Sequence, residues 1–310
     1  EEVSLMRVVP IKTLAVLEQT IAAHERLRKK DRRPILTVSA GTCGRARGAL
    51  KVVDALRTSL RKAKLDKKVR LRVTGCHGYC EAEPNIIVQP HDLFYQKVDP
   101  KDAALVVSDT TRKKKPVPEL CFHQPATGKP AKRERDIPFY AKQKRLVLGD
   151  NARIDPTSID DYFSIGGYSA LAKVLRKLGP EDIIAEIKAS GLRGRGGAGF
   201  PTALKWDLTR KQPGSVKYVI CNADEGDPGA YMDRSLLEGN PHRVLEGIMI
   251  GAFAIGATEG VIYVRDEYPL AVKHVTIAIE ALRKRRLLGP DILGAGFSFD
   301  FRIVKGAGAF

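Results

Sequence analysis

The spacing of apolar residues in the first third of the chain predicts alternating helices and strands. Apolar side chains recur about every three to four positions in two stretches, which is typical of helices packed on a core. Short β-branched runs between these stretches indicate strands, and the segment Pro90-His91-Asp92 indicates a hairpin turn. The expected order is a helix at 12–28, a strand at 35–38, a helix at 49–63, a strand at 69–73, hairpin strands at 85–89 and 93–98, and a helix near Ala103.

Residues 111–150 lack this periodicity. Prolines 116, 118, 125, 130 and 138 stand there among lysines and arginines. Because proline interrupts both helices and strands, we expect a basic, proline-rich linker or arm.

From Ile154 onward the pattern becomes that of an α/β domain. Proline opens or lies just inside four of the five expected helices, where its missing N–H costs no hydrogen bond. The expected helices are 168–177, 180–189, 201–210, 241–257 and 269–286, and the expected strands are 218–221, 261–264 and 299–304. The chain ends on residues 306–310, directly after a strand, so we expect a fragment of a longer protein. The fold class is therefore α/β, with domains at 1–110 and 151–310 joined by the linker 111–150.

Length and composition allow two ordinary hydrophobic cores. The chain has 310 residues, of which 43% are hydrophobic. The most apolar stretch, residues 248–255, is far shorter than the about 18 residues that a membrane helix needs, so we expect no membrane insertion. No export leader precedes Met6, and the cytoplasm is the expected compartment.

The formal net charge of +17 is concentrated in the first half. Residues 1–150 carry 32 Lys and Arg against 17 Asp and Glu, whereas residues 151–310 carry 21 against 19. Basic runs lie at 26–30, 61–64 and 112–115. A nucleic-acid partner would use such runs, but aromatics make up only 6% of the chain and none interleaves with the runs. Solvated faces or an acidic protein partner are favoured, and no nucleic acid is expected.

Five cysteines at uneven spacings do not resemble a disulfide framework. Cys76 and Cys80 lie on one loop after an expected strand, and Cys43 lies at a turn after another. Three thiolates that converge in this way indicate iron–sulfur binding, so these three are the candidate metal ligands. The alternative is that small buried cysteines simply pack.

The segment Gly191 to Thr202 is rich in glycine and contains Gly-x-Gly-x-x-Gly at Gly194, Gly196 and Gly199. It follows an expected helix rather than a strand, so an ordinary Rossmann turn is not predicted. Glycines nevertheless let the backbone approach a phosphate closely, and the helix that follows presents unpaired N–H groups. We expect a phosphate-binding loop; the alternative is a flexible surface loop.

A second candidate site follows the expected strand 218–221. The sequence Asn222-Ala223-Asp224-Glu225-Gly226-Asp227 places three acids and an amide at the end of that strand. Ligands of α/β folds bind at the carboxyl ends of strands, so this segment is a candidate ligand site. The alternative is a solvated acidic turn, which would have the same sequence. Cys221 is interpreted as core packing.

The N-terminal cysteine segments are similar to those of the thioredoxin-like 2Fe-2S ferredoxins. The resemblance covers Gly41 to Cys43, Gly48-Ala49, Gly75 to Cys80 and Pro84. It implies a thioredoxin-like fold and a 2Fe-2S cluster held by a Cys-x4-Cys pair and a Cys-x3-Cys pair. Cys43, Cys76 and Cys80 match three of those ligands. The first ligand falls on Val38, which cannot bind iron; Ser39 or Cys121 could replace it, or the cluster is labile or lost.

The segment from about Gln143 to Phe310 resembles the NADH-binding FMN flavoprotein subunit of respiratory complex I and its relatives in soluble NAD-linked and electron-bifurcating hydrogenases and formate dehydrogenases. The motifs that carry the resemblance are Ile154-Asp155-Pro156, Gly166-Gly167-Tyr168, Gly191 to Trp206, Cys221 to Arg234 and Gly306-Ala307-Gly308. It implies an incomplete Rossmann-like FMN- and NADH-binding domain. It also implies hydride transfer from NADH to FMN and one-electron relay through iron–sulfur clusters. The family's 4Fe-4S site lies in a part that this sequence does not contain.

The resemblance assigns residues to the cofactors and assigns no catalytic side chain. Phe200 matches an aromatic near NADH, Lys205 a basic residue near the cofactors, and Asp227 an acid that faces the NADH ribose. Asn222, Asp224 and Glu225 match flavin ligands. The full set of expected cofactor-binding residues is Gly194, Arg195, Gly196, Gly197, Ala198, Gly199, Phe200, Thr202, Lys205, Asn222, Asp224, Glu225, Gly226 and Asp227.

Three functional hypotheses follow. The first is an NADH-oxidising or NAD-reducing flavoprotein subunit whose partners are other iron–sulfur or redox subunits of a hydrogenase, a formate dehydrogenase or a similar complex. The second is a non-catalytic paralogue that keeps the fold and docks other subunits. A basic nucleic-acid binder, which would elute from DNA with salt, is the third.

Overall fold

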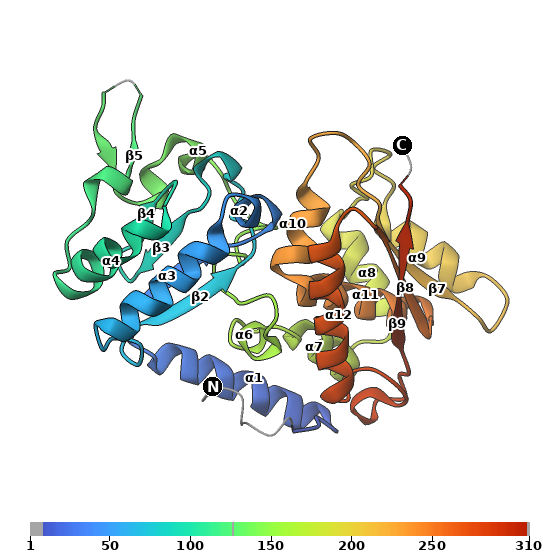
Figure 1. The fold of residues 1–310 in the computed structure, drawn as a ribbon. Coiled ribbons are helices and arrows are strands. Elements are labelled where there is room, and N and C mark those ends of the chain that lie inside the picture. The colour runs from blue at the N-terminus through green and yellow to red at the C-terminus, as the bar shows by residue number, and fades with distance from the viewer. Residues whose placement is uncertain (1–8, 126, 309–310) are drawn as a thin grey trace. The chain divides into compact units, whose positions relative to one another are not determined.

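The computed structural model describes residues 9–125 and 127–308, and the chain forms two compact units (Figure 1). The N-terminal unit consists of Lys29–Ser158 with Ser235–Asn240. The C-terminal unit consists of the chain up to Arg28, Ile159–Arg234, and the chain from Pro241 onward. The expected domain boundaries followed the order of the sequence, whereas these units interleave along it. Residues 309–310, where the expected family match ends, lie outside the described residues.

A four-stranded mixed sheet organises the N-terminal unit. Its order is β2-β1-β3-β4, and the strands are β1 (Ile35–Ser39), β2 (Arg70–Thr74), β3 (Ile86–Gln89) and β4 (Leu93–Tyr95). β1 pairs parallel with β2 and antiparallel with β3, and β3 and β4 form the expected hairpin. The parallel connection runs through α3 (Ala49–Lys62), as a crossover between parallel strands requires. This arrangement confirms the expected thioredoxin-like fold.

The two faces of this sheet bury different side chains. Leu36 and Val38 of β1 pack against Val52 and Leu56 of α3 in one apolar cluster. The opposite face carries a second cluster, which contains Ile87, Phe94, Ala131, Ile137 and Tyr140. Since neighbouring strand residues point to opposite faces, Val38 and Ser39 must face different surroundings.

Part of the segment 111–150, expected as a linker, packs on this second face through Ala131, Ile137 and Tyr140, whereas Val117 and Cys121 pack in the cluster on the α3 face. The segment forms β5 (Phe122–His123), β6 (Pro130–Ala131) and α5 (Pro138–Ala141), together with short turns. Tyr140 packs edge-on against Phe94 with ring centroids 5.9 Å apart, and the Arg145 guanidinium lies 4.6 Å from the centre of its ring. Aromatic contacts of this kind produce no periodic spacing of apolar residues in the sequence, which is why residues 111–150 were expected to form a linker.

A three-stranded parallel sheet organises the C-terminal unit. Its order is β7-β8-β9, with β7 (Tyr218–Ala223), β8 (Glu259–Arg265) and β9 (Asp300–Gly306). Helices connect the strands, as the α/β pattern predicted, and this confirms the Rossmann-like arrangement (Figure 1). The helices of this unit or reaching into it are α1 (Leu14–Lys30), α6 (Ile159–Phe163), α7 (Ser169–Lys177), α8 (Pro180–Ser190), α9 (Thr202–Lys211), α10 (Met232–Gly239), α11 (Pro241–Ile255) and α12 (Pro269–Lys284).

The expected long helices and strands are all present within a few residues of their expected bounds. Among the described residues, the sequence missed four shorter α-helices: α2 (Thr42–Ala46), α5, α6 and α10. They are too short for a helical repeat of apolar residues to stand out. Among the described residues, no helix is both long and apolar enough to cross a membrane.

A buried carboxylate in the C-terminal unit anchors the start of α7. Glu246 of α11 accepts hydrogen bonds from the Tyr162 hydroxyl at 2.7 Å and from the backbone N–H groups of Tyr168 at 2.9 Å and Leu171 at 3.1 Å. The first amides of a helix lack partners within the helix, and here a neighbouring helix supplies the acceptor. Glu246 is therefore a fold-determining residue of this unit.

Replacing Glu246 with glutamine should lower the free energy of unfolding by about 2 kcal/mol, because its NH2 group would face donors rather than accept from them. Urea unfolding followed by the fluorescence of Trp206, the chain's one tryptophan, measures this unit. Glu280→Gln on the exposed face of α12 is the matched control. Equal unfolding midpoints for the two variants would contradict the anchoring role.

Candidate functional site

The glycine-rich loop connects α8 to α9 in the C-terminal unit. α8 ends at Gly191, whose φ of 67° lies in the left-handed region that favours glycine. Two backbone hydrogen bonds close the loop: the Gly194 N–H donates to the Phe200 carbonyl at 2.9 Å, and the Thr202 N–H donates to the Leu192 carbonyl at 3.0 Å. The loop is thus a defined turn that delivers the chain to the start of α9.

The tip of this loop is open. A Cβ placed on Gly196 or Gly197 would meet no described atom within 4 Å, and Gly197 has a φ of 102°. Arg195, Ala198 and the ring of Phe200 beside it are also partly or largely exposed. Space above glycine backbone, followed by a helix N-terminus, is the geometry that admits a phosphate group.

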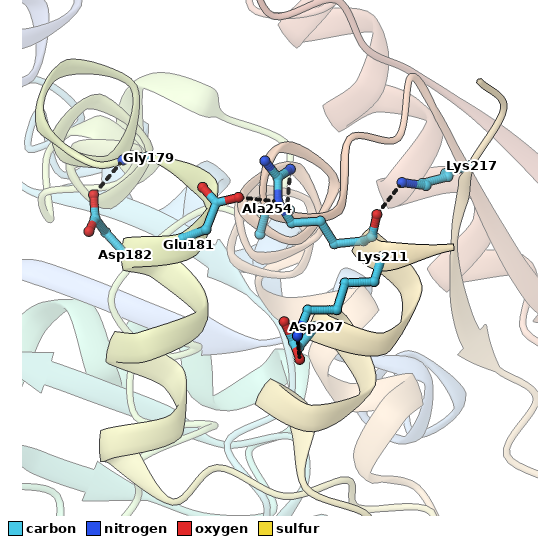
Figure 2. A network of polar contacts seen from close by, with 8 residues as sticks. Gly179, Glu181, Asp182, Asp207, Lys211, Lys217 and Ala254 are labelled. Carbon is cyan, nitrogen blue, oxygen red and sulfur yellow. Dashed lines mark hydrogen bonds and ion pairs between the residues drawn. The ribbon is translucent and has the colours of Figure 1, made fainter. Parts of the chain in front are cut away.

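A polar network fixes the helices on either side of this loop (Figure 2). Arg210 of α9 donates to Glu181 of α8 at 2.7 Å and to the Ala254 carbonyl of α11 at 3.3 Å. Lys217 in turn donates to the Arg210 carbonyl at 2.6 Å. The pKa of Glu181 is lowered, chiefly by its hydrogen bond with Arg210. One arginine therefore ties three helices together, at the ends of α8 and α9 that lie away from the loop.

A groove of about 550 Å³ runs between α8 and α9 beside the loop. Its walls are apolar at Ile184, Ile187 and Leu204, and its charged lining consists of two basic residues, Lys188 and Arg193, and two acidic residues, Glu181 and Asp207. Apolar walls with a few charged groups suit a ligand with an aromatic part and a polar part. Lys205, one of the expected cofactor residues, lies on the exposed side of α9.

The acidic loop leaves the carboxyl end of β7, as expected. Asn222 Oδ1 accepts from the Asp224 N–H at 3.1 Å. The two carboxylate oxygens of Glu225 accept from the N–H groups of Asp233 at 3.0 Å and Arg234 at 3.2 Å, in the first turn of α10. Glu225 therefore caps a helix of the protein itself.

Two residues of the β8–α12 connection hold the same loop from the other side. Arg265 donates to the Glu225 carbonyl at 3.0 Å, and the Tyr268 hydroxyl donates to that carbonyl at 3.1 Å. Arg265 also lies 3.8 Å from the Asp224 carboxylate. Burial, and then the Glu225 charge, raise the pKa of Tyr268. Arg265 and Tyr268 are positioning residues that the sequence did not reveal, because they lie about 40 positions downstream of the loop that they hold.

The expected site residues thus fall into two sets. The hydrogen bonds described above join residues within one loop, or join a loop to a neighbouring helix. They do not join the glycine-rich loop to the acidic loop. Asp224 and Glu225 are built into the protein, whereas Asp227 is exposed beside the exposed Pro228 and Gly229. The backbone carbonyl of Asp227 accepts from the Ala230 N–H at 3.1 Å, which closes a turn and leaves its carboxylate toward solvent.

The cysteine loop lies in the N-terminal unit. Cys76 Sγ and Cys80 Sγ are 4.0 Å apart, and the Gly78 N–H donates to Cys76 Sγ at 3.2 Å. The hydrogen bond with Cys80, and then burial, raise the pKa of Cys76. None of the five cysteines, all of which are described, forms a disulfide. Cys121 is buried in the apolar cluster on the α3 face, and its thiol donates to the Val117 carbonyl at 3.5 Å.

Sequence reasoning missed the buried polar residues around this loop. His77 is fully buried, its Nε2 lies 2.7 Å from the Thr74 hydroxyl, and burial lowers its pKa to about 3. Asn151 donates to the Cys76 carbonyl at 3.1 Å. Glu83 is also buried, directly before a proline. These side chains fix the backbone of the loop.

Residues 187–310 match the family model of the Nuo51 FMN-binding domain. The NADP-reducing hydrogenase subunit HndC of Solidesulfovibrio fructosivorans is 52% identical over 169 residues, which cover 54% of this chain and 34% of that protein. The F subunit of the NADH-quinone oxidoreductase of Aquifex aeolicus is 49% identical over 153 residues, which cover 49% of this chain and 35% of that protein. An NAD+-reducing NiFe hydrogenase in its H2-reduced state aligns with a TM-score of 0.41 and 19% identity over 95% of this chain and 46% of its own.

The chain spans about a third of the length of these two curated relatives. The family match begins within α8 and runs to the end of the sequence. It includes the glycine-rich loop and the acidic loop, the two segments on which the expected resemblance to complex I flavoproteins rested. Residues 187–310, with both candidate loops, are therefore similar to the Nuo51 FMN-binding domain.

Proposed function

We propose that this chain is the front part of an NADH-oxidising, or NAD-reducing, flavoprotein subunit of a multi-subunit redox complex. The observation that carries the proposal is the match to an FMN-binding domain over both candidate loops. Relatives named as subunits of an NADP-reducing hydrogenase and of an NADH-quinone oxidoreductase support an oxidoreductase role linked to nicotinamide nucleotides.

The residues present fit such cofactors. The open glycine tip, the start of α9 at Thr202 and the groove beside them suit a nucleotide with phosphate and ring parts. FMN, when bound, would accept a hydride from NADH and release electrons singly to iron–sulfur centres. The chain's own part is to bind and orient, and no side chain is assigned as a nucleophile or general base.

Each set of residues has a proposed task. Gly194 to Gly199 and Thr202 would present backbone amides to nucleotide phosphates, with Phe200 and Lys205 beside them. Asn222 and Gly226 would lie against the flavin, on a backbone that Asp224 and Glu225 hold through Arg265 and α10. Exposed Asp227 would meet the ribose of NADH.

The proposed partners are other iron–sulfur or redox subunits of a hydrogenase, a formate dehydrogenase or a similar complex. The surplus of basic residues in the first half favours an acidic surface on such a partner. The cytoplasm is the proposed compartment, since five cysteines at uneven spacings do not resemble the disulfide framework of a secreted protein.

A glycine substitution in the longer protein that contains this chain tests the proposal. Gly197→Val should lower the affinity for NADH or the retention of FMN at least about tenfold, because the side chain would occupy the open tip and disfavour the left-handed backbone. Nucleotide affinity is measured by titration, flavin content by absorbance, and activity by NADH oxidation with an artificial electron acceptor.

Gly214→Val is the matched control. Gly214 also has a left-handed φ, of 110°, and also has no described neighbour within 4 Å, but it lies in the connection between α9 and β7. Both variants should lose a similar amount of stability, and only Gly197→Val should lose nucleotide binding. A parent protein without flavin and without NADH oxidation, in its intact complex, would instead favour a non-catalytic docking subunit.

A further inference from the structure

The side chains around the cysteine loop do not fit a cluster with four protein ligands. Val38, which matches the family's first ligand, is fully buried in the apolar cluster with Val52 and Leu56 of α3. Its strand partner Ile86 lies in the same cluster. A side chain at position 38 therefore points into the α3 core, and Cys121, the other candidate, is buried in that same core.

Ser39 faces the cysteine loop, but it is already engaged. Its hydroxyl donates to the carboxylate of Glu83 and lies 3.4 Å from the Gly75 carbonyl. Glu83 in turn accepts from the Asn85 N–H at 3.2 Å. Across the described residues, no group of three or more His, Cys, Asp and Glu side chains is placed to hold a metal ion.

Cys76 and Cys80 form a close pair on one loop. Their sulfurs are 4.0 Å apart, and a disulfide needs a separation of about 2 Å. Gly78 between them has a φ of 93°, which turns the chain back so that the two sulfurs approach. Asn151 holds the Cys76 carbonyl, and the Tyr140 hydroxyl donates to the His77 carbonyl at 3.4 Å. Forming the disulfide therefore requires movement of the two cysteine side chains, on a backbone that these hydrogen bonds already hold in place.

We propose that Cys76 and Cys80 are a reversible thiol–disulfide pair that reacts with small disulfides. Cys80 is partly exposed and reacts first, whereas Cys76 is 6% exposed and resolves the mixed disulfide. In a cytoplasmic protein such a pair is a redox-sensing site rather than a structural bridge.

The exchange balances with a low-molecular-weight disulfide as the oxidant. The Cys80 thiolate attacks one sulfur of the oxidant, the oxidant's S–S bond breaks, and its first thiolate leaves and takes the Cys80 proton. The Cys76 thiolate then attacks the Cys80 sulfur, and the second thiolate leaves with the Cys76 proton. Two protein thiols lose two electrons and two protons, and one small disulfide becomes two thiols.

Oxidised glutathione tests the pair on the complete 310-residue chain. The chain is equilibrated at set ratios of reduced to oxidised glutathione, and remaining thiols are alkylated and counted by intact mass. Two of the five thiols should become protected, reversibly, and peptide mapping should find the Cys76–Cys80 disulfide. Loss of the pair's reactivity in Cys80→Ser, with Cys121→Ser and Cys221→Ser unchanged, is the expected pattern.

One further variant and one reconstitution experiment make the outcome decisive. Cys76→Ser should hold one glutathione on Cys80, because nothing then resolves the mixed disulfide. Anaerobic reconstitution with iron and sulfide should leave the parent chain without a stoichiometric cluster. Two irons per chain with Cys76 and Cys80 shielded from alkylation, or no protected pair at any glutathione ratio, would overturn the proposal.

Discussion

Replacing Glu83 with glutamine is expected to stabilise the N-terminal unit above neutral pH. Burial raises the pKa of this carboxyl from 4.5 to about 7, while hydrogen bonds from Ser39 and the Asn85 amide lower it in part. Of the nearby charged groups, Cys80 raises the pKa and Arg47 lowers it. At neutral pH and above, the protein therefore holds an ionised carboxylate in a poorly solvated place.

The direction in which stability changes with pH follows from proton linkage. The folded state binds the Glu83 proton more tightly than the unfolded state does. The stabilising contribution is therefore fully present below pH 4.5 and is lost as the pH rises through about 7. The difference between these two pKa values corresponds to about 3 kcal/mol. Glutamine keeps the size of the side chain and can still accept from Asn85, but it does not ionise.

Hydrogen exchange of the β1 and β3 amides, measured from pH 5 to pH 8 with thiols kept reduced, gives the stability of this unit. The parent chain should lose stability over that range relative to Glu83→Gln. Glu81→Gln, two residues away and exposed, is the control and should follow the parent. Parallel pH profiles for all three chains would show that Glu83 does not titrate near neutral pH.

Elements with a repeating pattern could be predicted from the sequence. α3, α11 and α12 have apolar faces at helical spacing, and proline marks the start of the last two. The strands of both sheets were expected for the same reason. Order along the chain did not predict how the units are composed, because most of α1 and the part of α10 from Ser235 onward group with residues far away in sequence.

The two loops of the candidate site could be located but not interpreted fully. The sequence around Glu225 indicated an acidic turn, and the family resemblance predicted that Glu225 is a flavin ligand. The structure adds that its carboxylate caps α10, a short helix that the pattern missed. Such hydrogen bonds depend on where a chain folds back, and no local pattern encodes them.

The cysteine segment shows the same limit at a single position. The resemblance to thioredoxin-like ferredoxins placed the absent ligand on Val38, and on that basis Val38→Cys would restore it. The strand register shows that position 38 faces the α3 core and position 39 faces the loop. Since a shift of one residue along a strand reverses the face, register decides which side chain can reach a site.

Replacing Asp227 with asparagine is expected to narrow the preference for NADH over NADPH, provided that the proposed function holds. Asp227 is exposed at the end of the acidic loop, where the resemblance places it against the ribose of NADH. A carboxylate there accepts hydrogen bonds from the 2′-hydroxyl and repels the 2′-phosphate of NADPH. Its backbone carbonyl closes the turn with Ala230, so the amide variant should keep the fold.

The measurement is the ratio of kcat/KM for NADH to that for NADPH in the longer, FMN-loaded protein. Removing one partly solvated like-charge contact is worth about 1–3 kcal/mol, which is roughly a tenfold to hundredfold change in this ratio. Asp266→Asn removes a charge from an exposed side chain that is ion-paired with Lys305 at 3.2 Å, and it should leave the ratio unchanged. Because salt screens exposed charges, the effect of Asp227→Asn should shrink at high ionic strength. An unchanged ratio with intact NADH turnover would mean that Asp227 does not face the ribose, whereas loss of all turnover in the parent protein would count against the proposed function itself.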